Sequence, residues 1–415
     1  MKQKKLLFKI NQFPQLSETF VTAQIITAIK CGFEVTILIK TLLNIEASKQ
    51  EHIFRKYNLI DKIIVEDFSI PKGKLLRFIK AALLILLNIY HLSKLIDFLK
   101  EKNNIELSHI YHFHYYRRFK NNEIIHVQFG NNHQPFELLN KIGLLKAKLI
   151  VSFHGHDAFF PIYGVLKDGY YDNLFKYGDL IVANTQYLAN QMLAIGCPKE
   201  KLKTIPVGVD TSFFKPENID KENNKCINLI TVGRLDKVKG HVYAITAVNQ
   251  LHKKGYHINF TIVGDGEEME NLKTLIAKKK LQNIVHLVGR KSHHEIRELF
   301  RQNDIFIFTS VAVENERRET QGLTSLEAQA SGLPAVVFDS GGVKYTVKEG
   351  VSGFVVPEYD IDVMVEKLEV LINNFELRIQ MGRQAVAFME KEFSQNIMDK
   401  QWCSIYNELI KNKNA

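Results

Sequence analysis

Short apolar runs alternate with longer amphipathic stretches along most of the chain. The runs are rich in Val, Ile and Phe, and the stretches between them place apolar residues three and four positions apart. A strand buried on both faces shows a continuous apolar run, whereas a spacing of three and four indicates one face of a helix. The pattern therefore predicts repeated β–α–β units and an α/β fold with parallel sheets.

The predicted strands form two series, separated by the charged, loop-like stretch KPENIDKENNK. We expect two doubly wound sheets with a boundary near residues 210–226, which gives a first domain at 1–210 and a second at 211–392. In such open sheets ligands bind at the carboxyl ends of the strands, so the residues after each run are site candidates. The strands are LLFKI, FEVTILI, KIIV, EIIHVQF, KLIVSFH and DLIVAN, then INLITVG, INFTIVG, IVHLVG, DIFIFTS, PAVVFDS and GFVVP.

The segment at residues 75–100, LLRFIKAALLILLNIYHLSKLIDFLK, has an apolar core flanked by Arg77, Lys80 and Lys94. The core, AALLILL, is far shorter than the ~20 consecutive apolar residues that a spanning helix needs. It suits an amphipathic helix lying at a membrane surface, and the alternative is a helix packed on the sheet or on another helix. The basic and then apolar start of the chain is interpreted as the first buried strand, because its apolar run is too short for a signal peptide.

Composition indicates an ordinary globular protein with material for two cores, since 46% of the 415 residues are hydrophobic and 24% are charged. The four cysteines, Cys31, Cys197, Cys226 and Cys403, are widely scattered and form no CxxC or Cys/His spacing. We therefore expect neither a zinc site nor a disulfide framework, and a reducing, cytoplasmic compartment.

The formal charge of +10 lies entirely in the first half of the chain. Residues 1–210 carry 28 Lys and Arg against 18 Asp and Glu, and residues 211–415 carry 27 of each kind. This asymmetry suggests that one half faces an anionic partner, with nucleic acid, acidic lipid and a phosphate-bearing substrate as candidates. The alternative is that these side chains are simply solvated lysine-rich helix faces.

Two glutamates lie eight positions apart in ETQGLTSLE. The charged run before the motif and Gly322 within it predict that Glu319 lies on a loop. We expect a short helix that carries Glu327, begins near Gly322 and ends at Ser331, with Gly332 as a left-handed cap. A loop carboxylate and a helix carboxylate can then converge on one pocket.

Several positive groups could bind an anion near these glutamates. The backbone amides of Gly322, Leu323 and Thr324 would lie at the positive end of the short helix. In VGRLDKVKG, Arg234 and Lys239 follow a strand end within one loop. Two cations there suit a diphosphate whose charge grows as a glycosidic bond breaks.

Three polar residues, His154, His156 and Asp157, follow the strand KLIVSFH. At the carboxyl end of a strand, His154 and Asp157 could orient a sugar hydroxyl or donate to it. The HxHD pattern also permits a metal, but no third or fourth ligand is evident, so no metal site is predicted.

Three further turns complete the candidates. Ser17 is a plausible N-cap with Glu18 in the first helical turn, at a place where a phosphate could bind. Gly341 and Gly342 form a diglycine turn that would let backbone approach phosphate closely. The glycine-rich VGDGEEMENL has Met269 where a dinucleotide fingerprint has its third glycine, and no kinase-type phosphate loop occurs.

In this order the motifs resemble glycosyltransferase family 4, which has the GT-B fold. The resemblance is strongest over residues 227–357 and extends loosely across nearly the whole chain. FPQLSETF together with HVQFG is similar to the bacterial colanic-acid and amylovoran branch, whose members build exopolysaccharide repeat units on a lipid carrier. The motifs that carry it are GRLDKVKG, VGDGEE, ETQGLTSLEAQASGLP and GGVKYTVKEGVSGFVVP, with FPQLSETF, HVQFG, SFHGHD and IPVGVD.

The resemblance implies two Rossmann-like domains facing a central cleft, with a final helix at 393–412 that crosses back to the first domain. It implies a retaining, metal-independent and cofactor-free transfer of a sugar from a UDP- or GDP-sugar donor. Arg234 and Lys239 would bind the diphosphate, Glu327 the ribose hydroxyls, Glu319 the transferred sugar, and His154 the sugar or the acceptor. The departing phosphate oxygen would accept the proton of the acceptor.

Two positions depart from the family pattern. Tyr345 stands where many relatives have the glutamate of a GG-x-P-E motif, which removes or alters that contact. QLSET replaces the diglycine loop that many relatives have in the first domain, as is normal for this branch.

The leading prediction is a cytoplasmic transferase working on a lipid-linked saccharide acceptor at the inner membrane face, where the basic first half would attract anionic lipid. One alternative is a nucleotide-sugar epimerase of the same fold. Another is a nucleic-acid-binding protein, because YHFHYYRRFK interleaves aromatic and basic residues. No nucleic-acid module signature occurs and the second half is neutral, so we expect no nucleic acid partner.

Overall fold

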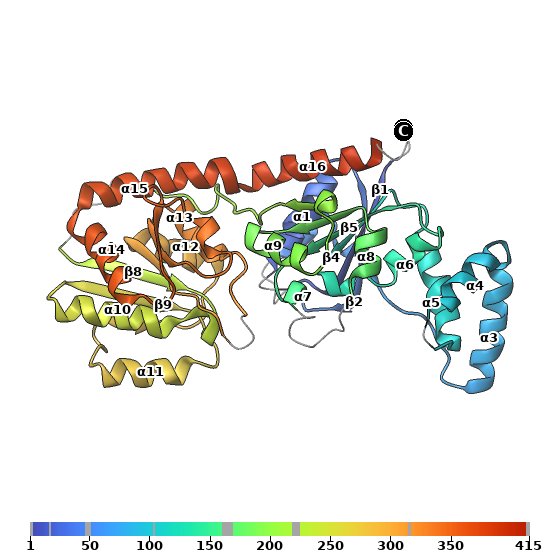
Figure 1. Cartoon of the computed structure of the whole chain (residues 1–415), viewed down its shortest axis with the longest axis horizontal. Helices are drawn as coiled ribbons and strands as arrows, with labels where there is room; N and C mark the ends of the chain where they lie inside the picture. The colour runs from blue at the N-terminus through green and yellow to red at the C-terminus, as the bar shows by residue number, and fades with distance from the viewer. Residues whose placement is uncertain are drawn as a thin grey trace. The chain divides into compact units, whose positions relative to one another are not determined.

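The computed structural model describes residues 3–15, 18–45, 51–102, 104–159, 169–217, 225–313 and 317–411. The chain forms two compact units, each built on one parallel sheet (Figure 1). The first unit comprises 1–183, 189–204 and 399–415, and the second comprises 184–188 and 205–398. Helices α9 (Gln186–Ala194) and α16 (Gln395–Lys411) contribute residues to both units.

The first unit contains a seven-stranded sheet with the order β3-β2-β1-β4-β5-β6-β7. All neighbouring strands run parallel, and the order reverses between β1 and β4, which is the topological switch point where doubly wound sheets bind ligands. The strands are β1 Lys5–Phe13, β2 Glu34–Leu42, β3 Ile63–Val65, β4 Ile124–Gln128, β5 Lys148–Phe153, β6 Leu180–Ala183 and β7 Leu202–Thr204. The helices are α1 Thr19–Lys30, α2 Glu51–Lys56, α3 Lys74–Leu87, α4 Leu92–Lys100, α5 Leu107–Arg117, α6 Phe136–Lys141, α7 His156–Phe159 and α8 Asp172–Tyr177.

The second unit contains a six-stranded parallel sheet with the order β10-β9-β8-β11-β12-β13. Apolar residues from α10, α11 and α14 pack against one set of alternating strand residues, and residues from α12 and α13 pack against the other set. The strands are β8 Ile227–Val232, β9 Ile258–Val263, β10 Val285–Leu287, β11 Ile305–Phe308, β12 Ala335–Phe338 and β13 Gly353–Val356. The helices are α10 His241–Lys253, α11 Met269–Lys278, α12 His293–Gln302, α13 Leu323–Ala330, α14 Ile361–Asn373 and α15 Phe375–Phe388.

All twelve predicted strands are present, and the α/β prediction with two doubly wound sheets is confirmed. The structure adds β7, whose sequence LKT has one apolar residue, Leu202, and two exposed residues, so it carries no strand pattern.

The C-terminal helix α16 packs on the first unit, as predicted. Tyr406 is fully buried, and its hydroxyl lies 2.9 Å from Nδ1 of His126 on β4. The ring of Trp402 lies 4.9 Å from the same imidazole. The expectation of no disulfide is wrong for one pair, since Cys31 at the end of α1 is bonded to Cys403 on α16. The two cysteines are 372 residues apart, so no local spacing could reveal the pair.

A helical insertion separates β3 from β4 and consists of α3, α4 and α5, seen at the right of Figure 1. The predicted single helix at 75–100 is broken at Asn88, and the two parts are bent by 74°. The buried face of α3 packs on α5 through Ala81, Leu84, Ile110 and Tyr111. By length and composition, no single described helix could span a bilayer, whereas the bent pair of 74–87 and 89–100 meets that test together.

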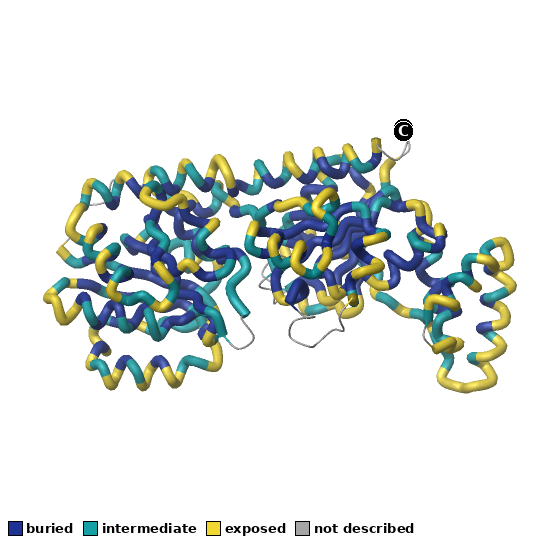
Figure 2. Tube along the Cα trace, viewed as in Figure 1, coloured by how far each residue is buried: buried dark blue, intermediate teal, exposed yellow. Residues whose placement is uncertain are grey.

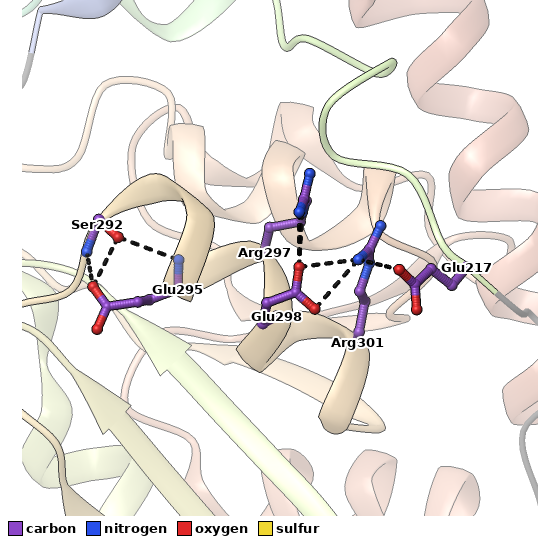
Figure 3. A network of polar contacts seen from close by, with 6 residues as sticks. All are labelled: Glu217, Ser292, Glu295, Arg297, Glu298 and Arg301. Carbon is purple, nitrogen blue, oxygen red and sulfur yellow. Dashed lines mark hydrogen bonds and ion pairs between the residues drawn. The ribbon is translucent and has the colours of Figure 1, made fainter. Parts of the chain in front are cut away.

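Polar contacts on α12 hold Glu217, which lies in the segment before β8 (Figure 3). Ser292 and Glu295 form a reciprocal capping box at the start of the helix. At its end, Arg301 donates hydrogen bonds to Glu298 and to Glu217 in the segment before β8. The network therefore ties this segment to the same helix.

Candidate active site

The loop after β8 carries Arg234 and Lys239, and a second loop braces it. The Leu235 amide donates to the Asp265 carbonyl at 2.9 Å, and the Glu268 amide donates to the Leu235 carbonyl at 2.9 Å. A Cβ added at Gly264 would lie 1.8 Å from the Gly233 carbonyl oxygen. The glycine of VGDGEE is therefore required by loop packing, which explains a glycine-rich motif without a dinucleotide fingerprint.

Lys239 and Glu319, both predicted as catalytic, form an ion pair. Their side chains are 15% and 19% exposed, and the Lys239 ammonium also lies 5.0 Å from the centroid of the Phe308 ring. Burial alone would raise the pKa of the Glu319 carboxyl, but the charge and hydrogen bond of Lys239, with the amides of Gln321 and Gly322, hold it below 4.5. Glu319 is therefore ionised at neutral pH. Phe308 was not predicted as a site residue.

Arg234 has a side chain that is 78% exposed, and its guanidinium lies 3.5 Å from the Asp236 carboxylate. Arg317 approaches the same carboxylate at 3.8 Å. Asp236 also accepts a hydrogen bond from the backbone amide of Lys239 at 3.2 Å. Asp236 therefore organises the cationic loop, a role that its position inside GRLDKVKG could have suggested.

The short helix after Glu319 is α13, and its predicted ends are confirmed. The helix runs from Leu323 to Ala330, with Gly322 at its N-cap and Ser331 at its C-cap. Gly322 and Gly332 both have positive φ, at 87° and 88°. A Cβ at Gly322 would lie 3.0 Å from the Phe308 ring, and the same ring lies under the Lys239 ammonium. The start of α13, with the amides of Leu323 and Thr324, is therefore close to the Lys239–Glu319 pair.

Glu327 lies within α13, and the structure records no hydrogen bond to its carboxyl group from any described residue. Burial raises the pKa of this carboxyl to about 8. At neutral pH most molecules therefore carry Glu327 protonated, with one donor and one acceptor oxygen available. Such a group is suited to a pair of vicinal hydroxyls.

The diglycine turn holds the loop that carries Glu319. The Gly342 amide donates to the Glu319 carbonyl at 2.8 Å. A Cβ at Gly342 would lie 1.8 Å from the Thr320 carbonyl oxygen, and one at Gly341 would lie 2.2 Å from that of Glu319. Both glycines thus allow a close approach of backbone to backbone, and their contact with phosphate stays a prediction.

Glu358 is a further residue that the sequence did not reveal. Its carboxylate accepts hydrogen bonds from the backbone amide of Ala312, just after β11, and from the Arg318 guanidinium beside Glu319. It therefore joins the two ends of the connection between β11 and Glu319.

In the first unit, His154 follows β5, and Gln128 holds it. Nε2 of His154 lies 2.9 Å from Oε1 of Gln128, whose amide nitrogen donates to Gln24 at 2.7 Å. The rings of Phe20 and Phe129 each lie 4.7 Å from the imidazole. Burial lowers the pKa of His154 to about 3, so the imidazole is neutral at physiological pH. Gln128 and Gln24 were not predicted.

Asp157 is 1% exposed and serves the turn that contains His154. Its carboxylate accepts hydrogen bonds from the amides of Gly130 at 2.6 Å, His154 at 3.1 Å and Gly155 at 2.9 Å. Phe129 beside it has φ of 68°, a strained value that this network maintains. Asp157 thus fixes the backbone around His154, and its contact with substrate stays a prediction.

The predicted N-cap at Ser17 lies outside the described residues. Helix α1 begins at Thr19 with Glu18 at the N-cap position, so Glu18 does not lie in the first turn as predicted. Burial raises the pKa of the Glu18 carboxyl to about 7.

The predicted site residues thus fall into two groups. His154 and Asp157 belong to the first unit, and the other described ones belong to the second. The second unit also has a cavity of about 250 Å³, lined by residues such as Asp236, His241 and Tyr243 and by none of the predicted site residues. Among the described residues, no group of three His, Cys, Asp or Glu side chains is placed to hold a metal ion.

The aromatic residues of YHFHYYRRFK are core residues. Tyr111, Phe113, Tyr115, Tyr116 and Phe119 are all at most 6% exposed. They cannot serve as an exposed platform for stacked bases, which removes one of the two observations behind the nucleic-acid alternative.

Comparisons with known proteins give a family match for each half of the chain. Residues 30–213 match the model of Glycosyltransferase Family 4, and residues 211–387 match that of Glycosyl transferases group 1. The chain is 29% identical to the putative colanic acid biosynthesis glycosyltransferase WcaL of Escherichia coli, over 98% of this chain and all of that protein. It is 28% identical to the amylovoran biosynthesis glycosyltransferase AmsK of Erwinia amylovora, with the same coverage.

Solved structures show the same fold. A glycosyltransferase from Rickettsia africae superposes with a TM-score of 0.70 at 19% identity, covering 99% of this chain and all of that one. Anabaena Alr3699/HepE in complex with UDP gives a TM-score of 0.71 at 17% identity, covering 98% and 100%.

Proposed function

The chain belongs to glycosyltransferase family 4, with a GT-B fold, and from this premise we propose that it moves a sugar from a nucleoside-diphosphate donor to a lipid-linked saccharide. The step is proposed to retain the anomeric configuration and to need no metal ion. Two full-length relatives are named for colanic acid and amylovoran biosynthesis, which supports a role in exopolysaccharide assembly. A related structure holds UDP, which supports a nucleotide-sugar donor.

The observation that carries the proposal is the cationic loop beside an ionised glutamate. Breaking the glycosidic bond leaves its electron pair on the departing phosphate oxygen, so negative charge grows on the diphosphate. Arg234 is exposed for this contact, and Lys239 is held over Phe308 beside it. Preorganised cations stabilise such charge without a metal ion.

The two glutamates take different parts of the donor. Glu319, ionised and held by two amides, accepts hydrogen bonds from hydroxyls of the transferred sugar. Glu327, whose raised pKa leaves it protonated, binds the two ribose hydroxyls as donor and acceptor.

The acceptor hydroxyl forms the new bond to the anomeric carbon, and its proton passes to the departing phosphate oxygen. His154 is neutral at physiological pH, so it contacts the substrate as an uncharged polar group and does not supply a positive charge. Gln128 accepts a hydrogen bond from Nε2 and so fixes the tautomer of the ring. No protein group is required to take the proton permanently.

The test is release of nucleoside diphosphate from a panel of UDP-, GDP- and ADP-sugars, with a membrane extract as the acceptor source and a chelator present. We expect turnover with one donor and a product of unchanged anomeric configuration by NMR. Full dependence on an added divalent cation would refute metal independence. Conversion of the donor to an epimer without acceptor would favour the epimerase.

A further inference from the structure

The outward face of α3 is apolar, although it is in contact with solvent. Nine of its fourteen residues are exposed, and Lys74 at its start is the only charged one among them. The opposite face is also apolar, since Ala81 and Leu84 pack against α5. Apart from Lys74, Arg77 and Lys80, the helix is therefore apolar on both faces, and a helix with so little polar surface is normally buried. The eight exposed apolar residues are Leu75, Leu76, Phe78, Ile79, Ala82, Leu83, Leu86 and Leu87.

The exposed surface continues past the end of α3. Ile89, Tyr90, Leu92 and Ile96 are 54%, 95%, 37% and 45% exposed. Together with the seven large residues of α3, they account for eleven of the twenty large hydrophobic residues that are exposed in the described part of the chain. We call these eleven residues the apolar patch, and the yellow stretches of α3 in Figure 2 show where most of it lies. Such a concentration marks an interaction site, because single exposed apolar residues are normally scattered.

Charge identifies what covers the patch. Residues 72–100 contain six Lys and Arg and one acidic residue, Asp97, a net charge of +5. Arg77 and Lys80 lie beside the patch and donate to the carbonyls of Pro71 and Ser69. A second copy of the chain would bring an equal positive charge against this surface. A bilayer with anionic headgroups complements both the apolar side chains and the surrounding cations.

We propose that the apolar patch inserts into the interfacial layer of an anionic lipid bilayer and anchors the first unit there. Helix α3 has fourteen residues, or about 21 Å at ~1.5 Å per residue, which is short of the ~30 Å hydrocarbon core. Its inner face is occupied by α5, so α3 lies in the plane of the interface and does not cross the bilayer. Tyr90 has the amphipathic ring that favours the headgroup level.

This inference deepens the proposed function, because a lipid-linked acceptor is reached at a bilayer surface. Attachment can be measured without donor or acceptor, so its failure is distinguishable from failure of sugar transfer.

The experiment is flotation of the full chain with large vesicles of phosphatidylethanolamine and phosphatidylglycerol. Leu83→Asp with Leu87→Asp alters two residues of the patch that lie one helical turn apart and are 54% and 62% exposed. We expect this variant to lose at least ten-fold in partition coefficient while its thermal unfolding is unchanged. The matched control is Leu193→Asp with Val370→Asp, two residues of 40% and 38% exposure outside the patch, which should bind as the wild type does.

The contribution of the surrounding positive charges is tested separately. Lys74→Gln and Lys100→Gln, each made alone, should weaken binding to these vesicles several-fold and reduce the dependence of binding on salt. Equal binding by the Leu83→Asp/Leu87→Asp variant, or no binding by the wild type, would overturn the proposal. A wild-type dimer in sedimentation equilibrium that the same variant converts to a monomer would also overturn it, because a second copy would then cover the patch. Nucleoside diphosphate release with a soluble acceptor should be retained in the Leu83→Asp/Leu87→Asp variant and in the lysine variants.

Discussion

Lys239 offers the sharpest test of the second-unit site, because its loss has separate effects on turnover and on stability. The change Lys239→Met keeps most of the aliphatic stem, which lies near Gly233, and removes the ammonium group that lies over Phe308 and pairs with Glu319. Loss of one preorganised charge at a leaving group costs roughly 2.7–4 kcal/mol of transition-state stabilisation. We therefore expect kcat to fall about 10²–10³-fold.

Stability should change as well, because Glu319 keeps its partly buried position without its ion-pair partner. Complete burial of an unpaired charge costs about 3–5 kcal/mol. The Glu319 side chain is 19% exposed and two amides still bind it, so we expect a loss of about 1–3 kcal/mol in the free energy of unfolding at neutral pH. The double variant with Glu319→Gln should regain most of this stability and none of the activity.

The pH dependence has a definite sign. In the wild type, the pKa of Glu319 is below 4.5, so its stabilising contribution is present above about pH 4.5 and is lost as the pH falls through the lowered pKa. Without Lys239, burial dominates and raises the pKa, so the single variant loses stability as the pH rises through 4.5. Chemical denaturation at pH 4 and pH 7 should show a deficit that grows with pH. A constant deficit, or a fall in kcat of less than about three-fold, would refute the assigned role.

Further changes test other parts of the site. Because the pKa of Glu327 is raised to about 8, the folded state binds more protons than the unfolded state between about pH 4.5 and 8, and stability should fall across this window in the wild type and less in Glu327→Gln, as denaturant titrations can show. Gly342→Ala would place a Cβ 1.8 Å from the Thr320 carbonyl, so we expect about 1–3 kcal/mol of destabilisation by calorimetry and reduced kcat. Glu358→Gln keeps the shape but weakens the clamp on Arg318, and should lower kcat about ten-fold with little change in thermal midpoint. Gln128→Leu removes the hydrogen bond to His154 and should reduce kcat/KM while the Cys31–Cys403 disulfide still forms. Unchanged kinetics would show that His154 does not need this hydrogen bond.

The fold could be predicted from the sequence because its strands are buried on both faces. Such strands are continuous apolar runs, which can be recognised from the local sequence without knowing the neighbouring strands. All twelve predicted strands are present. Helix α13 was placed correctly because Gly322 and Gly332 mark its two ends chemically. The break at Asn88 was missed, because the apolar period continues through it on both sides.

The candidate site was predicted in part, and the missing residues share a physical reason. Lys239 and Glu319 were found because charged residues at strand ends stand out in a sequence. Glu358, Phe308 and Gln128 act through contacts with residues that are 26 to 69 positions away, such as Phe308 with Lys239 and Gln128 with His154. Long-range contacts of this kind leave no local pattern. The Cys31–Cys403 bond was missed for the same reason.

The first unit includes residues 399–415, which follow the whole of the second unit in the sequence. His126 at the centre of its sheet has Tyr406 as a hydrogen-bond partner, and Tyr406 is translated 280 residues after it. A ribosome that has made only residues 1–204 has therefore produced a sheet with an uncovered imidazole and an unpaired Cys31. The first unit is complete only when α16 has also been translated, so a fragment that stops before α16 should yield less folded first unit on expression.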